Sequence, residues 1–118
     1  MRNTNATIFE PAELTATTTG DSVDLSAWHG MADIILASSA TGGEGQTAVV
    51  TIEHSDDDDV FASAGITFGT IDHTEGVTQT ARVNIDQLKQ YVRAKVTLAG
   101  DTPAVTCAVL VSGPRNYA

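Results

Sequence analysis

The chain has 118 residues, the usual size of a single domain and long enough to bury a hydrophobic core without a disulfide or a metal. It carries 15 acidic and 6 basic residues, a net charge of −9, which disfavours binding to bare nucleic acid or to anionic membranes. The start at Met1 has no basic-then-apolar leader, and no apolar stretch approaches the about 18 residues of a membrane helix. We therefore expect neither an export signal nor a membrane-spanning segment.

The composition favours β-structure. Thr (17 residues) and Val (11) are abundant, and both have stiff, branched side chains that suit a pleated surface, whereas strong helix formers such as Leu, Lys and Glu are scarce. We predict a single all-β domain over residues 1–118, an antiparallel β-sandwich or small barrel of seven to eight short strands. The single Cys107 cannot form an internal disulfide and is expected to be a small buried side chain.

In the N-terminal half, a polar segment over residues 1–7 is expected to be a flexible arm, and a first strand should follow at 14–18. Residues 20–22 form a turn. The strand at 32–37 is apolar on both faces around Ile34-Ile35-Leu36, which is typical of a central strand. Glycines at 42, 43 and 45 indicate a loop.

The middle of the chain alternates clearly between apolar and polar residues. Ala48, Val50 and Ile52 point to one face of a strand that ends at an acidic run, Asp56–Asp59. A second alternating strand is expected over 77–85, after a short strand at 66–68. Residues 86–90 are compatible with one helical turn, the single helical element that we expect near this position.

Two alternating runs close the sequence. The inward positions are expected to be Val92, Ala94, Val96 and Leu98 in the first run and Val105, Cys107, Val109 and Val111 in the second. They flank the turn Gly100–Pro103, so we predict a β-hairpin here. A short tail at 113–118 should follow.

The acidic run Asp56, Asp57, Asp58 and Asp59 is the candidate metal site. Clustered carboxylates in a loop suit a hard cation such as Ca²⁺. The run lacks the spacing of a calcium loop, so a solvated turn between two strands is the alternative interpretation. No other cofactor is expected.

Trp28 and Tyr117 are the candidate protein-interface residues, because exposed aromatic side chains are frequent at binding surfaces. Burial of Trp28 at one end of the sandwich is the alternative. The sequence contains no Gly-x-Ser-x-Gly or Ser-x-x-Lys motif, and its three histidines show no metal-ligand spacing. We therefore expect a protein that binds rather than an enzyme, without catalytic residues.

Several segments follow each other in an order that can be compared with known proteins. They are the step Ser-Val-Asp-Leu-Ser at 22–26, the strand that runs into an acidic Ser-x-Asp loop at 52–61, Tyr91-Val92-Arg93, the Gly100–Pro103 turn, and the short end Val111-Ser112-Gly113. In this order, over roughly residues 14–112, the chain resembles the small structural proteins encoded in the head-gene cluster of tailed bacteriophages. The acidic run departs from the family pattern because it lacks the glycine of an Asp-Gly turn.

The resemblance implies a virion component, a capsid decoration or cement protein. Such a protein binds the major capsid protein on the outer surface of the shell, as a homotrimer or as a monomer that bridges neighbouring subunits, and is made in the cytoplasm of the host bacterium. Nucleic acid and membranes are not expected as partners. A tail or head-tail accessory protein is the alternative within this class. A carbohydrate-binding β-sandwich module, using Trp28 and the acidic loop, is the alternative from a different class.

Overall fold

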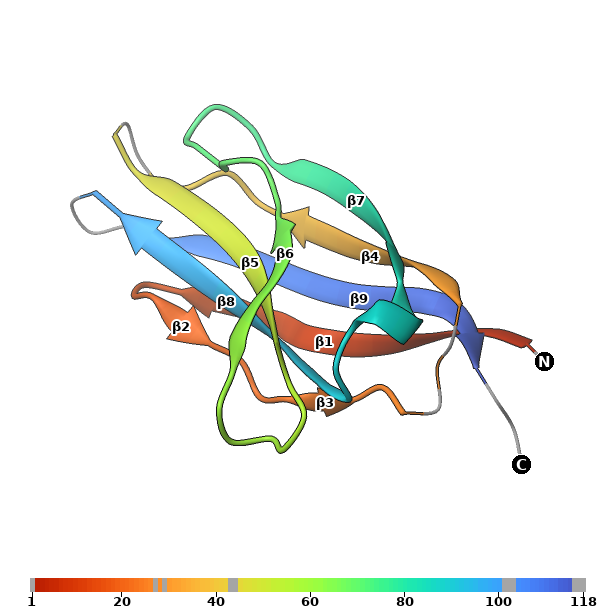
Figure 1. Ribbon diagram of the computed structural model, residues 1–118. Helices are drawn as coiled ribbons and strands as arrows, with labels where there is room; N and C mark the ends of the chain where they lie inside the picture. The colour runs from red at the N-terminus through yellow and green to blue at the C-terminus, as the bar shows by residue number, and fades with distance from the viewer. Residues whose placement is uncertain (1, 27, 29, 43–44, 101–103, 116–118) are drawn as a thin grey trace.

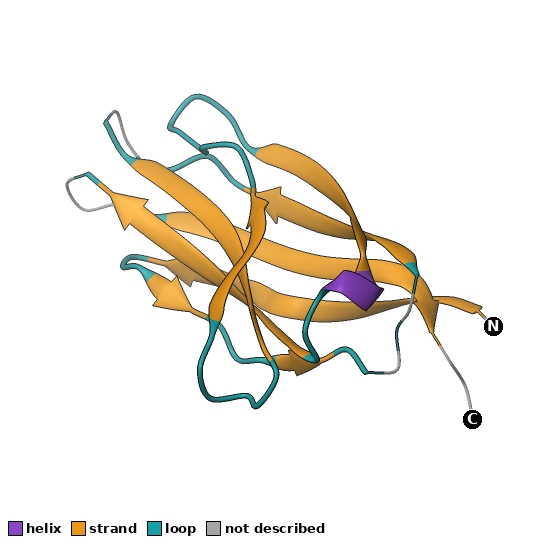
Figure 2. Ribbon diagram, in the orientation of Figure 1, coloured by secondary structure: helices purple, strands orange, loops and turns teal. Residues whose placement is uncertain are grey.

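The computed structural model describes residues 2–26, 28, 30–42, 45–100 and 104–115. Within them the chain forms nine strands and one turn of 3-10 helix, which confirms the expected all-β class (Figure 2). The elements are β1 (Arg2–Leu14), β2 (Thr18–Thr19), β3 (Val23–Asp24), β4 (Met31–Ser38), β5 (Thr47–Ser55), β6 (Ala62–Thr67), β7 (Val77–Asn84), the helical turn η1 (Ile85–Gln87), β8 (Tyr91–Ala99) and β9 (Val105–Arg115). The helical turn overlaps the predicted segment 86–90 but begins one residue earlier and ends at Gln87.

The strands form two antiparallel sheets packed face to face, a β-sandwich (Figure 1). One sheet has the strand order β1-β9-β4-β7, which we call sheet A. The other, sheet B, has the order β2-β8-β5-β6, and β3 pairs with the same edge of β8 as β2 does further along. The prediction of a central strand at residues 32–37 is confirmed, because β4 lies between β9 and β7.

The core lies between the sheets and is built from alternate residues of four strands. The inward side chains with no exposed surface are Ile34 and Leu36 of β4, Ala48, Val50 and Ile52 of β5, Val92, Ala94 and Val96 of β8, and Val109 and Val111 of β9. Burial of one such Val, Ile or Leu side chain contributes about 1.5–3 kcal/mol of transfer free energy. Cys107 is buried in the same core, as expected.

The expected flexible arm at residues 1–7 is wrong for the described part of that segment. Arg2–Thr7 belongs to β1 and pairs with β9 in the register Arg2↔Arg115 to Thr7↔Leu110. The polar character of the segment suggested an arm, but the backbone hydrogen bonds of an edge strand do not require apolar side chains. The expected tail at 113–118 is also shorter than predicted, since β9 continues to Arg115.

The first strand likewise differs from the prediction. β1 ends at Leu14, and the chain then crosses to sheet B, where Thr18 pairs with Val96 of β8. Ile8 and Phe9, which alternation did not single out, are buried in the core. The alternating residues Leu14, Ala16 and Thr18 therefore do not share one strand.

The predicted hairpin between the last two runs is wrong. β8 pairs with β5 in sheet B, whereas β9 pairs with β1 and β4 in sheet A, so the connection between them crosses from one sheet to the other. Alternation fixes the face on which a side chain lies but not the strand beside it. Gly100, at the start of this connection, has φ +101°, and a Cβ there would lie 2.6 Å from the carbonyl oxygen of Gly45.

The molecule is elongated, with principal extents of 48 × 28 × 21 Å. The described ends of β1 and β9 lie side by side at one end of the long axis (Figure 1). Within the described chain, no helix has the length and apolar character that crossing a membrane requires.

Candidate functional site

The acidic run lies in the loop between β5 and β6, where one of its carboxylates organises the loop itself. Oδ1 of Asp57 accepts hydrogen bonds from the Ser55 hydroxyl (2.7 Å), the Asp59 amide (3.0 Å) and the Val60 amide (3.1 Å). These bonds, the one from Ser55 foremost, lower the pKa of Asp57 below its ordinary value. This pattern is a side-chain-capped turn, a common use of Asp in loops.

Two other carboxylates of the run point to different neighbours. Asp58, whose φ is +59°, accepts a hydrogen bond from the hydroxyl of Ser22, and Asp56 lies 3.7 Å from the ammonium group of Lys89. Among the described residues no group of three or more Asp, Glu, His or Cys side chains is placed to hold a metal ion. The geometry thus gives the predicted Ca²⁺ site no assembled set of ligands, because adjacent residues of the loop direct their carboxylates apart.

The two candidate interface aromatics are not brought together. Trp28 is only 9% exposed and belongs to the hydrophobic core, and its backbone amide donates to the carbonyl of Leu25 (3.0 Å). Trp28 as an exposed interface residue is therefore wrong, and the alternative of burial holds. Tyr117 lies outside the described residues.

The outer surface of sheet A offers a different candidate. Across β4, β7 and β9 the outward positions form three aligned rows, which place Ile35 beside Leu110 and Thr80, and Ala37 beside Ala108 and Thr78. We call this surface the neutral face. It consists of Asp33, Ile35 and Ala37 of β4, Thr78, Thr80 and Arg82 of β7, and Thr106, Ala108, Leu110 and Ser112 of β9.

The neutral face has no net charge, although the whole chain carries −9. Its two charged residues, Arg82 and Asp33, form an ion pair with 3.4 Å between Nη1 and Oδ1. Ile35 and Leu110 lie at its centre and are only half-buried by the molecule itself. The surface therefore combines apolar and hydroxyl-bearing side chains without the repulsion that the rest of the molecule would offer to an acidic neighbour.

The outer surface of sheet B is different in character. Arg93 of β8 forms an ion pair with Glu53 of β5 (2.8 Å), and its guanidinium lies 3.9 Å from the ring centroid of Phe61. The acidic loop adjoins this sheet, and Ser55 beneath it is completely buried. The outer surface of sheet B thus carries an ion pair and adjoins the acidic loop, whereas the outer surface of sheet A includes the neutral face.

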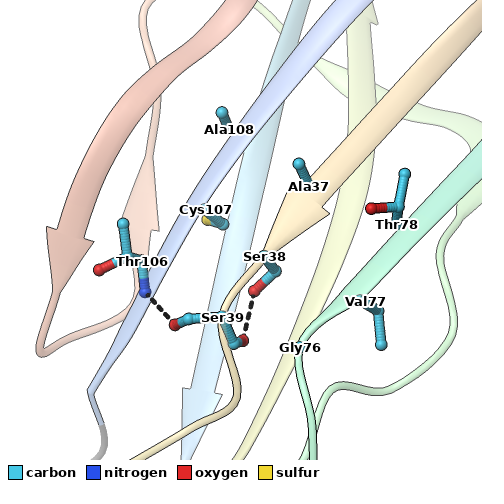
Figure 3. A pocket seen from close by; sticks show the side chains of 9 residues that line it. All are labelled: Ala37, Ser38, Ser39, Gly76, Val77, Thr78, Thr106, Cys107 and Ala108. Atoms are coloured by element: carbon cyan, nitrogen blue, oxygen red, sulfur yellow. Dashed lines mark hydrogen bonds between the residues drawn. The ribbon is translucent and has the colours of Figure 1, made fainter.

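A shallow hollow of about 430 Å³ opens at one end of the neutral face (Figure 3). Ala37, Thr78 and Ala108 line it together with Ser39, whose hydroxyl accepts from the amide of Thr106 (3.0 Å). Cys107 also borders the hollow. Burial raises the pKa of its thiol above the ordinary value, which keeps it protonated at neutral pH and makes it a poor nucleophile.

The sequence contains one signal for the neutral face. The run Ile34-Ile35-Leu36 is apolar on both faces and predicts the central strand that is observed, but only Ile34 and Leu36 are fully buried. Ile35 faces outward and is half-exposed. An apolar residue at an outward position of a central strand is thus the sequence feature that indicates the neutral face.

No protein-family model matches this chain, and no curated protein matches its sequence. The similarity to known proteins lies in the fold.

Three solved structures illustrate that similarity. The VP2 subviral particle of infectious bursal disease virus matches with a TM-score of 0.59 and 13% identity over 94% of this chain and 32% of the viral chain. The SPBc2 prophage-derived protein YomS matches with a TM-score of 0.54 and 14% identity over 95% of this chain and 94% of YomS. The CBM36-1 domain of a multidomain xylanase from the hindgut metagenome of Trinervitermes trinervoides matches with a TM-score of 0.51 and 12% identity over 98% and 100% of the two chains.

At these identities the matches establish a shared β-sandwich fold. This chain spans about a third of the viral chain, so it corresponds to one part of that protein. The same fold occurs in a virus particle, in a prophage-derived protein and in a domain of a xylanase. The function must therefore be argued from the surface of this molecule.

Proposed function

We propose that this chain is a non-enzymatic structural protein of a virion, which binds the outer surface of a phage capsid and bridges neighbouring capsid subunits. The observation that carries this proposal is the neutral face. Half-buried Ile35 and Leu110 lie at the centre of a sheet surface without net charge, whose two charged residues, Arg82 and Asp33, pair with each other.

The remaining surface fits the same role. The net charge of −9 favours solubility of the free protein and of a crowded particle, and it disfavours contact with packaged nucleic acid. Many copies, each held by a modest contact and repeated by the symmetry of the shell, stabilise a particle through avidity without any single tight site. The partner is then the major capsid protein, the location is the capsid surface after synthesis in the host cytoplasm, and a homotrimer is one arrangement that meets this requirement.

The structural similarities support this class of function. Sandwiches of the same fold occur in the VP2 particle of a virus and in a prophage-derived protein. A rigid two-sheet domain whose apolar side chains lie inside leaves its outer faces and edges for neighbours, which is what a bridging protein needs.

Two alternatives differ in their support. A tail or head-tail accessory protein would use the same neutral face against another virion protein. A carbohydrate-binding module has the xylanase domain as a match in fold, but the sugar-stacking role suggested for Trp28 is lost because Trp28 is buried. The neutral face therefore favours a virion protein over a carbohydrate-binding module.

The test is a single substitution at the centre of the neutral face. Ile35→Glu places a carboxylate where a capsid subunit would exclude water, and we expect binding to capsids of the encoding phage to weaken more than about tenfold. Thr97→Glu is the matched control, because Thr97 is exposed on β8 of the opposite sheet and the charge change is the same. Binding is measured by co-sedimentation of purified full-length protein with particles that lack it.

Particles without the protein should also lose their DNA at a lower temperature than complete particles. Equal binding of the Ile35→Glu and Thr97→Glu proteins would rule out the neutral face as the contact. Recovery of the protein with purified tails and not with heads would replace the capsid role by the tail alternative.

A further inference from the structure

The two sheets have four outer edges, and three of them are protected against strand addition. β1 contains Pro11, which has no amide hydrogen, and its register with β9 shifts at two places. β6 has a register shift against β5 and a glycine at φ +80°, Gly65. At the fourth edge β2 and β3 have two residues each. Interruptions and short edge strands of this kind are how proteins prevent unwanted pairing.

β7 is the exception. Its eight residues pair with β4 without interruption, from Met31↔Asn84 to Ser38↔Val77, and no proline or glycine lies within it. It is the last strand of sheet A, and Figure 1 shows it at the border of the sandwich with no strand beyond it. A regular edge strand of this length, about 27 Å at roughly 3.4 Å per residue, presents a row of amide and carbonyl groups to a further strand.

The core beside β7 is incompletely covered. The inward residues Val77, Ala81 and Val83 are only half-buried, whereas the inward residues Ile34 and Leu36 on the neighbouring β4 have no exposed surface. The inward residue Gln79 is engaged in hydrogen bonds with the backbone amide (2.7 Å) and carbonyl (3.1 Å) of Gly69. The room for further apolar side chains therefore lies at the end of β7 that carries Val83.

A groove of about 560 Å³ lies at this place, between β7 and β6. Its lining is mixed: Met31, Ala64, Ile66, Val83 and Leu88 are apolar, Arg82, Asn84 and Gln87 are polar, and Met31 is 45% exposed. At the opposite end of β7, Val77 and Thr78 border the hollow of the neutral face (Figure 3). Both hollows therefore adjoin the same free strand.

We propose that the free edge of β7 accepts an extended segment of a partner protein as an added strand. Main-chain hydrogen bonds to β7 supply affinity, and every second side chain of the segment is apolar and enters the groove between β7 and β6. The segment is neutral or basic, because the whole chain carries −9 and the one charged side chain of β7, Arg82, already pairs with Asp33. The same repulsion disfavours a second copy of this chain as the occupant.

This inference stands independently of the proposed function, since it concerns a different surface and holds for any partner that offers such a strand. The probes are two libraries of twelve-residue peptides, displayed for selection against the full-length protein. One alternates Val or Ile with Thr, Ser or Lys, and the other has Asp or Glu in place of Lys. We expect selection from the first library alone, and slower hydrogen exchange of the β7 amides when a selected peptide is bound.

Variants then locate the binding site. Val83→Lys and Met31→Lys each place a charge in the groove, and each should weaken the selected peptide about tenfold or more. Met31 is exposed, so Met31→Lys tests the groove even where Val83→Lys lowers stability. Thr97→Lys on β8 adds the same charge away from the groove and should leave the affinity unchanged.

Three results would overturn the inference. They are selection of acidic peptides as readily as basic ones, peptide binding without protection of the β7 amides, and equal affinity of the groove variants and the control. Protection of β7 that rises with protein concentration in the absence of peptide, together with dimers in sedimentation, would identify a second copy as the occupant and refute the choice of partner.

Discussion

His54 shows how one side chain responds to its surroundings. It lies on β5, half-buried, and its Nδ1 accepts a hydrogen bond from the backbone amide of Lys89 (3.3 Å), which requires a neutral ring. Burial is the main cause that lowers the pKa of His54 below its ordinary value of 6.5, and the charge of Lys89 adds to it, while Asp56 opposes both. The folded protein therefore disfavours protonation of this imidazole.

Stability should consequently decrease as the pH falls below 6.5. In that range the unfolded chain binds a proton at His54 that the folded protein resists, so the free energy of unfolding declines until the pH reaches the lowered pKa. We expect His54→Gln to show a smaller decline than the wild type in urea unfolding at pH 7.5 and pH 5.5. His73→Gln is the control, because His73 is exposed, and it should keep the full decline.

Three carboxylates begin to act at a lower pH than His54 does. Hydrogen bonds lower the pKa values of Asp24 and Asp72, from Ser26 and Thr74 respectively, as they do for Asp57. Their contribution to stability is complete above about 3.8 and is lost as the pH falls below that value. The decline assigned to His54 therefore begins at a higher pH than the loss of these contributions.

At the scale of an element, the loop between β5 and β6 is held by its own side chains. Three hydrogen bonds converge on one oxygen of Asp57, and Asp58 adopts a positive φ that Asp tolerates better than most residues do. The loop also contacts the segment before β3 through Ser22. The acidic residues thus give the loop a defined shape.

Asp57→Ala should loosen this loop without unfolding the sandwich. The amide of Val60 loses its acceptor, so its hydrogen exchange should become faster, while the core amides of β5 and β8 keep their protection. Asp59→Ala removes the same charge from the same loop, but the hydrogen bonds of the described residues include none to its side chain. Equal acceleration at Val60 in both variants would contradict the structural role of Asp57.

At the scale of the whole molecule, the first and last strands pair with each other and complete sheet A. β1 and β9 pair along almost their entire length, and β9 joins that pair to β4 in the centre of sheet A. Pairing of segments so far apart in sequence costs loop-closure entropy and forms late in folding, but it completes the cooperative unit.

Deletion of residues 2–7 tests this closure. The deletion removes the partners of β9 from Leu110 to Arg115 and exposes that edge to water, so the midpoint of urea unfolding should fall clearly below that of the intact chain. Both proteins carry the same N-terminal tag, which removes the tag as a cause of any difference. An unchanged midpoint would mean that residues 2–7 do not stabilise the fold, as expected of a flexible arm.

Much of this architecture could be predicted from local patterns. Period-two alternation placed Val50, Ile52 and Val96 in the core, because the side-chain direction of a strand depends only on position along it. The class, the central position of β4, the helical turn after β7 and the burial of Cys107 followed in the same way.

The candidate site was predicted less well, since each site residue depends on distant neighbours. Trp28 is buried in the core, and the carboxylates of the acidic run Asp56–Asp59 contact different partners. The neutral face and the free edge of β7 exist only because β4, β7 and β9 lie side by side, and no local pattern encodes that order.

The sequence by itself determined that this is a β-protein and which side chains face inward, because alternation is a local property of the chain. Only the tertiary structure decided which strands are neighbours. The runs of β8 and β9 alternate as well as any hairpin, yet they lie in different sheets, and the polar residues 2–7 became a strand. The physical reason is that backbone hydrogen bonds between strands are the same for every sequence, so the choice of partner is made by the packing of the whole core.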